Sequence, residues 1–200
     1  MAVDIYCYIE RLTVDGWVFT GEIGPNEEHR YEPEAPKLAP VPTLHSVNKE
    51  LASILLDTGW AIRAATPYVA VAPRRGRPID LSSPLAEHFK YYDDDAGTVY
   101  SWFTAQELSS FDLASHVITR EAYVDPRVAQ FFIGCPFGFP SDQWPSDIPI
   151  SFAGWSRDGV EVRWMESYDT IVKEFIDVVV PVLSRHPEPS HTRLIIRGNW

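Results

Sequence analysis

The sequence predicts a single domain of the α+β class, spanning residues 1–200, in which helices pack on a mixed but mostly antiparallel sheet. Three observations support this. The chain has 200 residues, 45% of them hydrophobic, which suits one domain with a substantial core. Apolar side chains alternate at residues 3–10, as in a half-buried strand. Apolar residues also recur every three or four positions from Ile171 to Val182, as on one face of a helix.

The N-terminal residues are expected to form a β-hairpin. Asp15-Gly16 favours a tight turn, and a second strand follows at residues 17–21. The first strand has an apolar face and a polar face, and the polar face carries Asp4, Tyr6, Tyr8 and Glu10. We interpret this polar face either as the solvent side of the strand or as the lining of a pocket.

Residues 22–45 contain five prolines and five glutamates. Proline lacks the backbone donor that a helix interior or a central strand needs. We therefore predict a long acidic loop without regular structure. Two roles stay open for it: a plain mobile loop, or a loop that binds a partner or acts as a lid.

Three helices are expected in the middle of the chain, each from a start signal. Ser46 precedes a helix at residues 47–58, and Ser83-Pro84 begins a second helix. Thr104 and Glu107 have the spacing of a capping box and begin a third. Short strands are expected at residues 68–72 and 98–103.

The C-terminal third is expected to hold two further helices and three strands. Asp125-Pro126 begins a helix that reaches about Ile133, and a Gly- and Pro-rich loop follows. The longest helix runs from about Tyr168 to Leu183, where Pro181 should kink or end it. The strands are expected at residues 150–155, 160–165 and 193–197, in one sheet with the earlier strands, and the last two in parallel.

The charge of the chain favours a protein that binds a basic partner in the cytoplasm. The net charge is −11, and residues 1–60 alone hold 4 basic and 10 acidic side chains. Such a surface repels nucleic acids and anionic membranes. No apolar run approaches the length of a membrane span, so we expect no nucleic-acid partner and no membrane partner. The expected partner surface is formed by Glu27, Glu28, Glu32 and Glu34.

An enzyme that acts on a small anionic ligand is the alternative. Arg74, Arg75 and Arg77 lie together in an otherwise acidic chain, and guanidinium groups match the geometry of phosphate and carboxylate. Asp4 and Glu10 would contribute carboxylates from the polar face of the first strand. A pocket in which these five side chains meet would favour the enzyme, and an exposed acidic surface would favour the binding protein.

The common catalytic motifs are absent from the sequence. It contains no G-x-S-x-G elbow, no Walker-type phosphate loop, no H-E-x-x-H and no C-x-x-C. The six histidines and two cysteines show no metal-ligand spacing, so we expect no metal and no cofactor.

Two short segments carry a family resemblance. The strand that begins Val3-Asp4-Ile5 and the later run Ser101-Trp102-Phe103-Thr104-Ala105-Gln106-Glu107-Leu108 resemble a group of uncharacterised bacterial and phage proteins. That group often has a histidine two residues after the aspartate, where this chain has Tyr6. The resemblance implies no particular activity.

Overall fold

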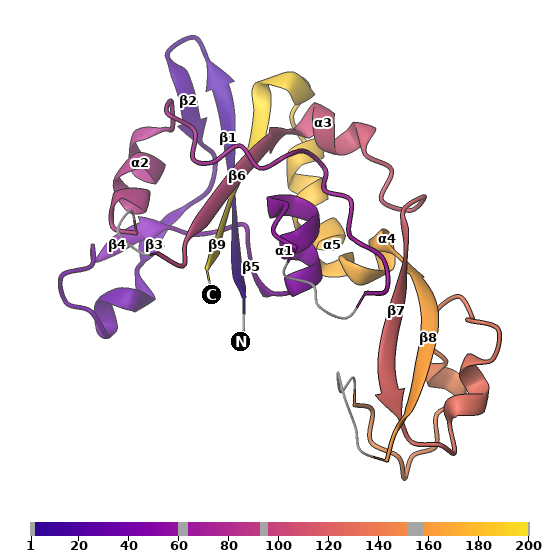
Figure 1. Ribbon diagram of the computed structural model, residues 1–200. Helices are drawn as coiled ribbons and strands as arrows, with labels where there is room; N and C mark the ends of the chain where they lie inside the picture. Colours follow the sequence, from indigo (N-terminus) through magenta and orange to yellow (C-terminus); the bar gives the residue numbers. More distant parts are fainter. Residues whose placement is uncertain (1–2, 60–63, 93–95, 152–157, 200) are drawn as a thin grey trace.

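The computed structural model describes residues 3–59, 64–92, 96–151 and 158–199. The predicted α+β class is confirmed, because helices pack on sheets whose strands are mostly antiparallel (Figure 1). The central sheet has five strands in the order β2-β1-β9-β6, and β5 pairs with β1 as well. These strands are β1 (Asp4–Thr13), β2 (Gly16–Phe19), β5 (Leu44–Val47), β6 (Val99–Thr104) and β9 (Thr192–Asn199).

The strand β1 shares one of its edges between two partners. Residues Glu10 to Thr13 pair with β2, and residues Asp4 to Cys7 pair with β5. The opposite edge of β1 pairs along its length with β9, so the first and last strands of the chain are neighbours at the centre of the sheet. This topology places the two ends of the chain close together (Figure 1).

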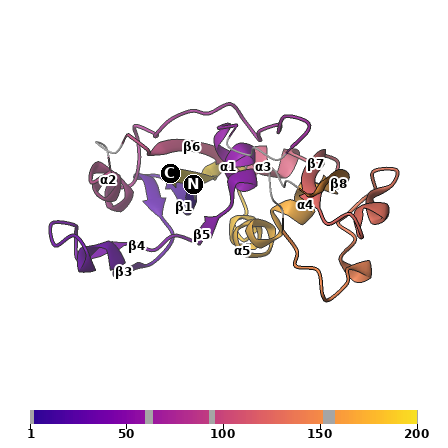
Figure 2. The ribbon, with the colours of Figure 1, turned by 60° about the horizontal axis from the view of Figure 1, so that its bottom comes forward.

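The apolar face of the sheet forms the main core. Ile5, Cys7 and Ile9 of β1 are almost fully buried there, as the alternation predicts. They pack with helices α1 (Lys49–Leu56), α3 (Ala105–Ser110) and α5 (Lys173–Ser184). The other face carries α2 (Ser83–Lys90), so the sheet has helices on both sides (Figure 2).

The helix start signals are largely confirmed. Thr104 and Glu107 form the predicted capping box of α3. Pro84 lies in the first turn of α2, at the second helical position rather than the first, because the helix begins at Ser83. The first helix begins two residues later than predicted, because Asn48 rather than Ser46 accepts the capping hydrogen bond from the backbone of Leu51.

The expectation that residues 22–45 lack regular structure is wrong. The chain leaves the edge of β1 at Thr20, forms β3 (Ile23–Pro25), a 3₁₀ turn η1 (Glu27–Arg30) and β4 (Leu38–Pro40), and returns at Thr43 into β5. Strands β3 and β4 pair with each other. Proline is tolerated because both of these strands are only three residues long and each has its proline as the last residue. We call residues 22–42 the covering segment, since it lies beside α2 on the polar side of the sheet (Figures 1 and 2).

The C-terminal strands depart from the prediction. Strand β8 (Val160–Ser167) does not join the central sheet but pairs with β7 (Val117–Val124), which the sequence did not predict. The parallel pairing expected between residues 160–165 and 193–197 is therefore wrong. This two-stranded sheet of β7 and β8 extends away from the central sheet (Figure 1). It carries a small core of its own, formed by Ala122, Val124, Val128, Phe132, Ile148, Val162 and Trp164.

Four smaller differences complete the comparison. The helix expected at residues 125–133 is only a 3₁₀ turn, η2 (Ala129–Phe132), and residues 68–72 do not form a strand. The expected long C-terminal helix is broken at Val172 into α4 (Tyr168–Ile171) and α5, whereas α5 continues through Pro181. Residues 152–155 of the strand expected at 150–155 lie outside the described residues. The remaining short turns are η3 (Ser141–Gln143) and η4 (Pro189–His191).

Within the described residues, none of the helices combines the length and the apolar character that a membrane crossing requires.

Candidate functional site

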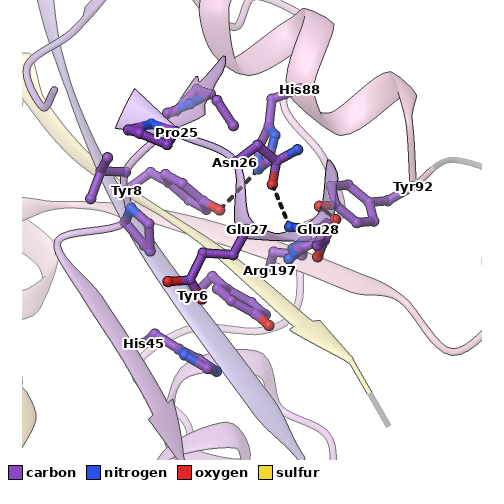
Figure 3. Close-up of a pocket in the computed structure, with 14 residues that line it drawn as sticks. Tyr6, Tyr8, Pro25, Asn26, Glu27, Glu28, His45, His88, Tyr92 and Arg197 are labelled. Atoms are coloured by element: carbon purple, nitrogen blue, oxygen red, sulfur yellow. Dashed lines mark hydrogen bonds between the residues drawn. The ribbon is translucent and has the colours of Figure 1, made fainter. Parts of the chain in front are cut away.

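A pocket with a volume of about 330 Å³ lies on the polar face of the central sheet (Figure 3). Its floor is formed by Tyr6 and Tyr8 of β1 and by Arg197 of β9. Its walls come from the end of α2 and from the covering segment. The residues that form these walls are Pro25, Asn26, Glu27, Glu28, Ala39, Pro40, Val41, Pro42, His88 and Tyr92, and His45 of β5 lies at one end.

Strand register explains why these floor residues are neighbours. Tyr6 of β1 lies opposite His45 on one side and opposite Arg197 on the other. Side chains at paired positions of adjacent strands point to the same face. The three side chains therefore form a row across the sheet, and the rings of Tyr6 and His45 stack with centroids 4.4 Å apart. Tyr8 is on the same face because it lies two residues further along β1.

Arg197 is the central charged group of the pocket. Only 2% of the residue is exposed. The guanidinium carbon lies 3.6 Å from the ring centroid of Tyr92 and 4.2 Å from that of Tyr6, so both rings contact the cation. Nε and Nη1 are buried and have no hydrogen-bond partner among the described residues. A buried guanidinium with unpartnered donors is costly, and such groups call for an explanation.

His88 supplies an uncharged polar group next to this cation. Its Nε2 lies 3.1 Å from the hydroxyl of Tyr8, within hydrogen-bond distance (Figure 3). Burial, with a smaller contribution from the charge of Arg197, lowers the pKa of His88 to about 4. Burial also raises the pKa of Tyr6, Tyr8 and Tyr92 above the usual value for a phenol. At neutral pH the imidazole of His88 is therefore neutral and the three phenols keep their protons.

The pKa of His88 makes the stability of the fold depend on pH. In the unfolded chain this histidine takes up a proton near pH 6.5, whereas in the fold it does so only near pH 4. Between these values the unfolded state binds more protons, so the stability that the neutral imidazole contributes is lost as pH falls. We expect the free energy of unfolding to fall by about 2 kcal/mol between pH 7 and pH 5 because of this histidine. Urea unfolding of the wild type and of His88→Gln at both pH values measures this, and the variant should lose less. Equal losses would contradict the assignment.

Hydrogen bonds hold the covering segment over the pocket. The hydroxyl of Tyr92 donates to the carboxylate of Glu28, and that of Tyr91 donates to Glu32. Within the covering segment, the side-chain oxygen of Asn26 accepts a hydrogen bond of 3.2 Å from the backbone N–H of Glu28 (Figure 3). Two of the four glutamates expected to attract a basic partner are thus bonded to tyrosines at the end of α2. The partner role of Glu27, Glu28, Glu32 and Glu34 stays a prediction.

The arginines singled out from the sequence lie elsewhere. Arg75 forms an ion pair with Glu107, which holds the pKa of Glu107 at about 2, and its guanidinium carbon lies 4.8 Å from the ring centroid of Trp102. Neither Arg74, Arg75 nor Arg77 lines the pocket at Arg197. The anion-binding role of Arg74, Arg75 and Arg77, together with Asp4 and Glu10, stays a prediction.

Asp4 and Glu10 lie on the predicted face of β1 but are engaged in separate contacts. Asp4 lies 2.8 Å from Nε2 of His45. Glu10 is fully buried and accepts hydrogen bonds from the side chain of Arg193 and from the backbone N–H of Ser82, both at 2.8 Å. The two carboxylates flank the two tyrosines in the sequence, and it is the tyrosines that line the pocket.

The sequence contained one signal for the missed residue Arg197. Residues 193–197 read Arg-Leu-Ile-Ile-Arg, so a charged residue stands at each end of an apolar run. Because side chains four apart on a strand share a face, both arginines had to lie on the side opposite to Leu194 and Ile196. The positions of His88 and Tyr92 in the pocket depend on the packing of α2 against the sheet, which a local sequence pattern does not show.

Comparison of the chain with models of known families, with curated proteins and with solved structures gives no match. Function must therefore be inferred from the pocket itself.

Proposed function

We propose that the protein binds a small molecule in the pocket through an anionic group that pairs with Arg197. The observation that carries this proposal is the buried guanidinium whose Nε and Nη1 lack a partner among the described residues. The N–H donors of a guanidinium lie in its plane, and the rings of Tyr6 and Tyr92 contact its central carbon. A carboxylate or phosphate approaches a guanidinium in that plane and accepts two parallel hydrogen bonds.

Arg193 provides an internal comparison for Arg197. It lies four residues earlier on the same strand and is also buried, at 1% exposed. Its Nε donates to Glu10 at 2.8 Å and its Nη1 donates to Asp80 at 2.8 Å. The fold thus satisfies one buried arginine of this strand with carboxylates. The other arginine lines a pocket and its Nε and Nη1 lack a partner among the described residues, which supports a ligand as the missing partner.

The walls of the pocket suit a small organic ligand. The hydroxyl of Tyr6 can donate a hydrogen bond to a ligand, whereas that of Tyr92 already donates to Glu28 and that of Tyr8 lies 3.1 Å from Nε2 of His88. The proline and tyrosine side chains offer apolar surface. The volume of about 330 Å³ is at the small end of the range for ligand pockets, roughly 300–1,000 Å³. The unpartnered atoms of Arg197 are sealed from solvent, so in this proposal the covering segment shifts when the ligand enters.

The pKa values of the polar groups in the pocket favour a role in binding over a role in acid–base catalysis. General acids and bases work best when their pKa lies near the working pH. The pKa of His88 is about 4 and that of Tyr8 is raised, so both lie far from neutrality, in opposite directions. Such groups serve as fixed hydrogen-bond partners at pH 7.

The test of this proposal is the variant Arg197→Met. We expect it to abolish binding of two probe anions, inorganic phosphate and 3-phenylpropanoate, in calorimetric titrations at pH 7. The fold should change in stability by less than about 1 kcal/mol, because loss of the ring contacts is offset by removal of unpartnered donors from the interior. Arg197→Lys should retain weak binding, since it keeps the charge but loses the planar fork.

Arg75→Ala serves as the control. Its guanidinium is already paired with Glu107, so probe binding should not change. If neither the probe anions nor any of the twenty common amino acids, each of which carries a carboxylate, binds the wild type, or if binding survives in Arg197→Met, the proposal is wrong. Attraction of a basic protein by the acidic surface, and a cytoplasmic location, remain separate predictions.

A further inference from the structure

The charges around the pocket are not those of a simple anion site. Arg197 is opposed by two carboxylates on the covering segment, Glu27 and Glu28, which also line the pocket. His88 is neutral at pH 7 because its pKa is about 4, and His45 lies 2.8 Å from the carboxylate of Asp4. A ligand with only negative charge would gain at the guanidinium but be repelled by both glutamates.

The two glutamates differ in how they are used. Glu28 accepts a hydrogen bond from the Tyr92 hydroxyl and contributes to the electrostatic environment of Arg197. Glu27 is exposed and directly precedes Glu28 in the same turn. In Figure 3 the side chain of Glu27 extends toward Tyr6 and His45, whereas Glu28 lies beside Tyr92 and Arg197. One carboxylate is thus next to the cation, and the other is presented to the rest of the pocket.

We infer that the ligand carries a cationic group as well as an anionic one, as an α-amino acid or a related amphoteric molecule does. This inference rests on the proposed function, since it keeps the anionic group at Arg197. The cationic group is recognised by Glu27, and the tyrosine and proline walls contact the remainder of the molecule. Each charge of such a ligand meets its opposite, so the repulsion that a plain anion experiences becomes an attraction.

The experiment compares ligands that differ only in their charges. The twenty common amino acids are titrated one at a time into the full chain at pH 7. The best of them is then compared with the matched acid that lacks the ammonium group and with the matched amine that lacks the carboxylate. We expect the amino acid to bind at least tenfold more tightly than either, because each loses one charge-assisted contact.

The variant Glu27→Gln identifies the group that recognises the cation. It should weaken amino-acid binding about tenfold and leave binding of the matched acid unchanged or slightly improved. Glu34→Gln is the control, because Glu34 lies on the same segment but does not line the pocket. Both positions are exposed, so neither substitution threatens the fold.

The outcomes of these titrations distinguish a failure of this inference from a failure of the proposed function. If a plain anion binds through Arg197 as tightly as every amino acid, or if Glu27→Gln changes nothing, the inference is wrong and the proposed function stands. If neither anions nor amino acids bind in a manner that depends on Arg197, the proposed function itself fails.

Discussion

Replacing Arg193 with alanine is expected to cost about 3–5 kcal/mol of the free energy of unfolding, because it leaves a buried carboxylate without its partner. Glu10 is fully buried, and its carboxylate lies 2.7 Å from Nη2 of Arg193. The guanidinium carbon also lies 3.9 Å from the ring centroid of Trp17, which covers it. Removing the arginine therefore leaves the negative charge of Glu10 unpaired in the interior of the protein, which is unfavourable.

Urea unfolding of Arg193→Ala measures this loss. Arg163→Ala is the control: Arg163 pairs with Glu161 at 3.0 Å, but its side chain is 55% exposed, so the change should stay within about 0.5 kcal/mol. The double variant Glu10→Leu with Arg193→Met removes both charges and should recover much of the loss. A loss below about 1 kcal/mol in Arg193→Ala would show that the pair is not buried as described.

Phe175→Ala is the second substitution with a large expected effect, about 3–5 kcal/mol, as for other buried aromatic side chains. Phe175 lies on α5 and is 1% exposed, within the main core beside Val179 and Leu183. Truncation removes apolar contacts and leaves a cavity that the neighbouring side chains fill only in part.

Val178→Ala on the same helix is the matched control. Val178 is 40% exposed, so its truncation should cost less than about 0.5 kcal/mol. The apolar pattern predicts a buried stripe of Ile171, Phe175, Val178, Val179 and Val182, and of α5 the structure buries Phe175, Val179 and Leu183. Equal effects at Phe175 and Val178 in urea melts would contradict the observed orientation of α5.

The parts of the fold that could be predicted depend on local patterns. Strand alternation and capping signals act over a few residues, so the faces of β1 and the start of α3 are confirmed. Strand β7 was missed because Arg120 interrupts its apolar alternation. That arginine is held by ion pairs with Glu50 at 2.9 Å and with Glu166 at 3.2 Å, contacts between residues distant in sequence.

The pocket was predictable only in part for the same reason. The alternation at residues 3–10 placed Tyr6 and Tyr8 on one polar face, which was considered as a pocket lining. The contributions of Arg197 and Tyr92 required the register of β9 and the position of α2 on the sheet. Local charge pointed instead to Arg75, whose guanidinium is paired with Glu107.

The contrast between Arg193 and Arg197 gives the account its sharpest stability test. Both are buried arginines on the same strand, but in the part of the chain that the structure describes carboxylates bond only to the first. Substitution of Arg193 should destabilise the fold strongly, and substitution of Arg197 should leave its stability nearly unchanged. Groups kept for binding rather than for folding are expected to behave in this second way.

The most direct test of the central claim is the Nε–H resonance of Arg197 in a ¹H–¹⁵N NMR titration, assigned with the Arg197→Lys variant. On addition of inorganic phosphate, of 3-phenylpropanoate or of the best-binding amino acid, this resonance should shift and reach saturation at the Kd measured by calorimetry. The Nε–H resonance of Arg75 should stay in place. A probe that binds while the Arg197 resonance remains unchanged would contradict the assignment of Arg197 as the ligand anchor.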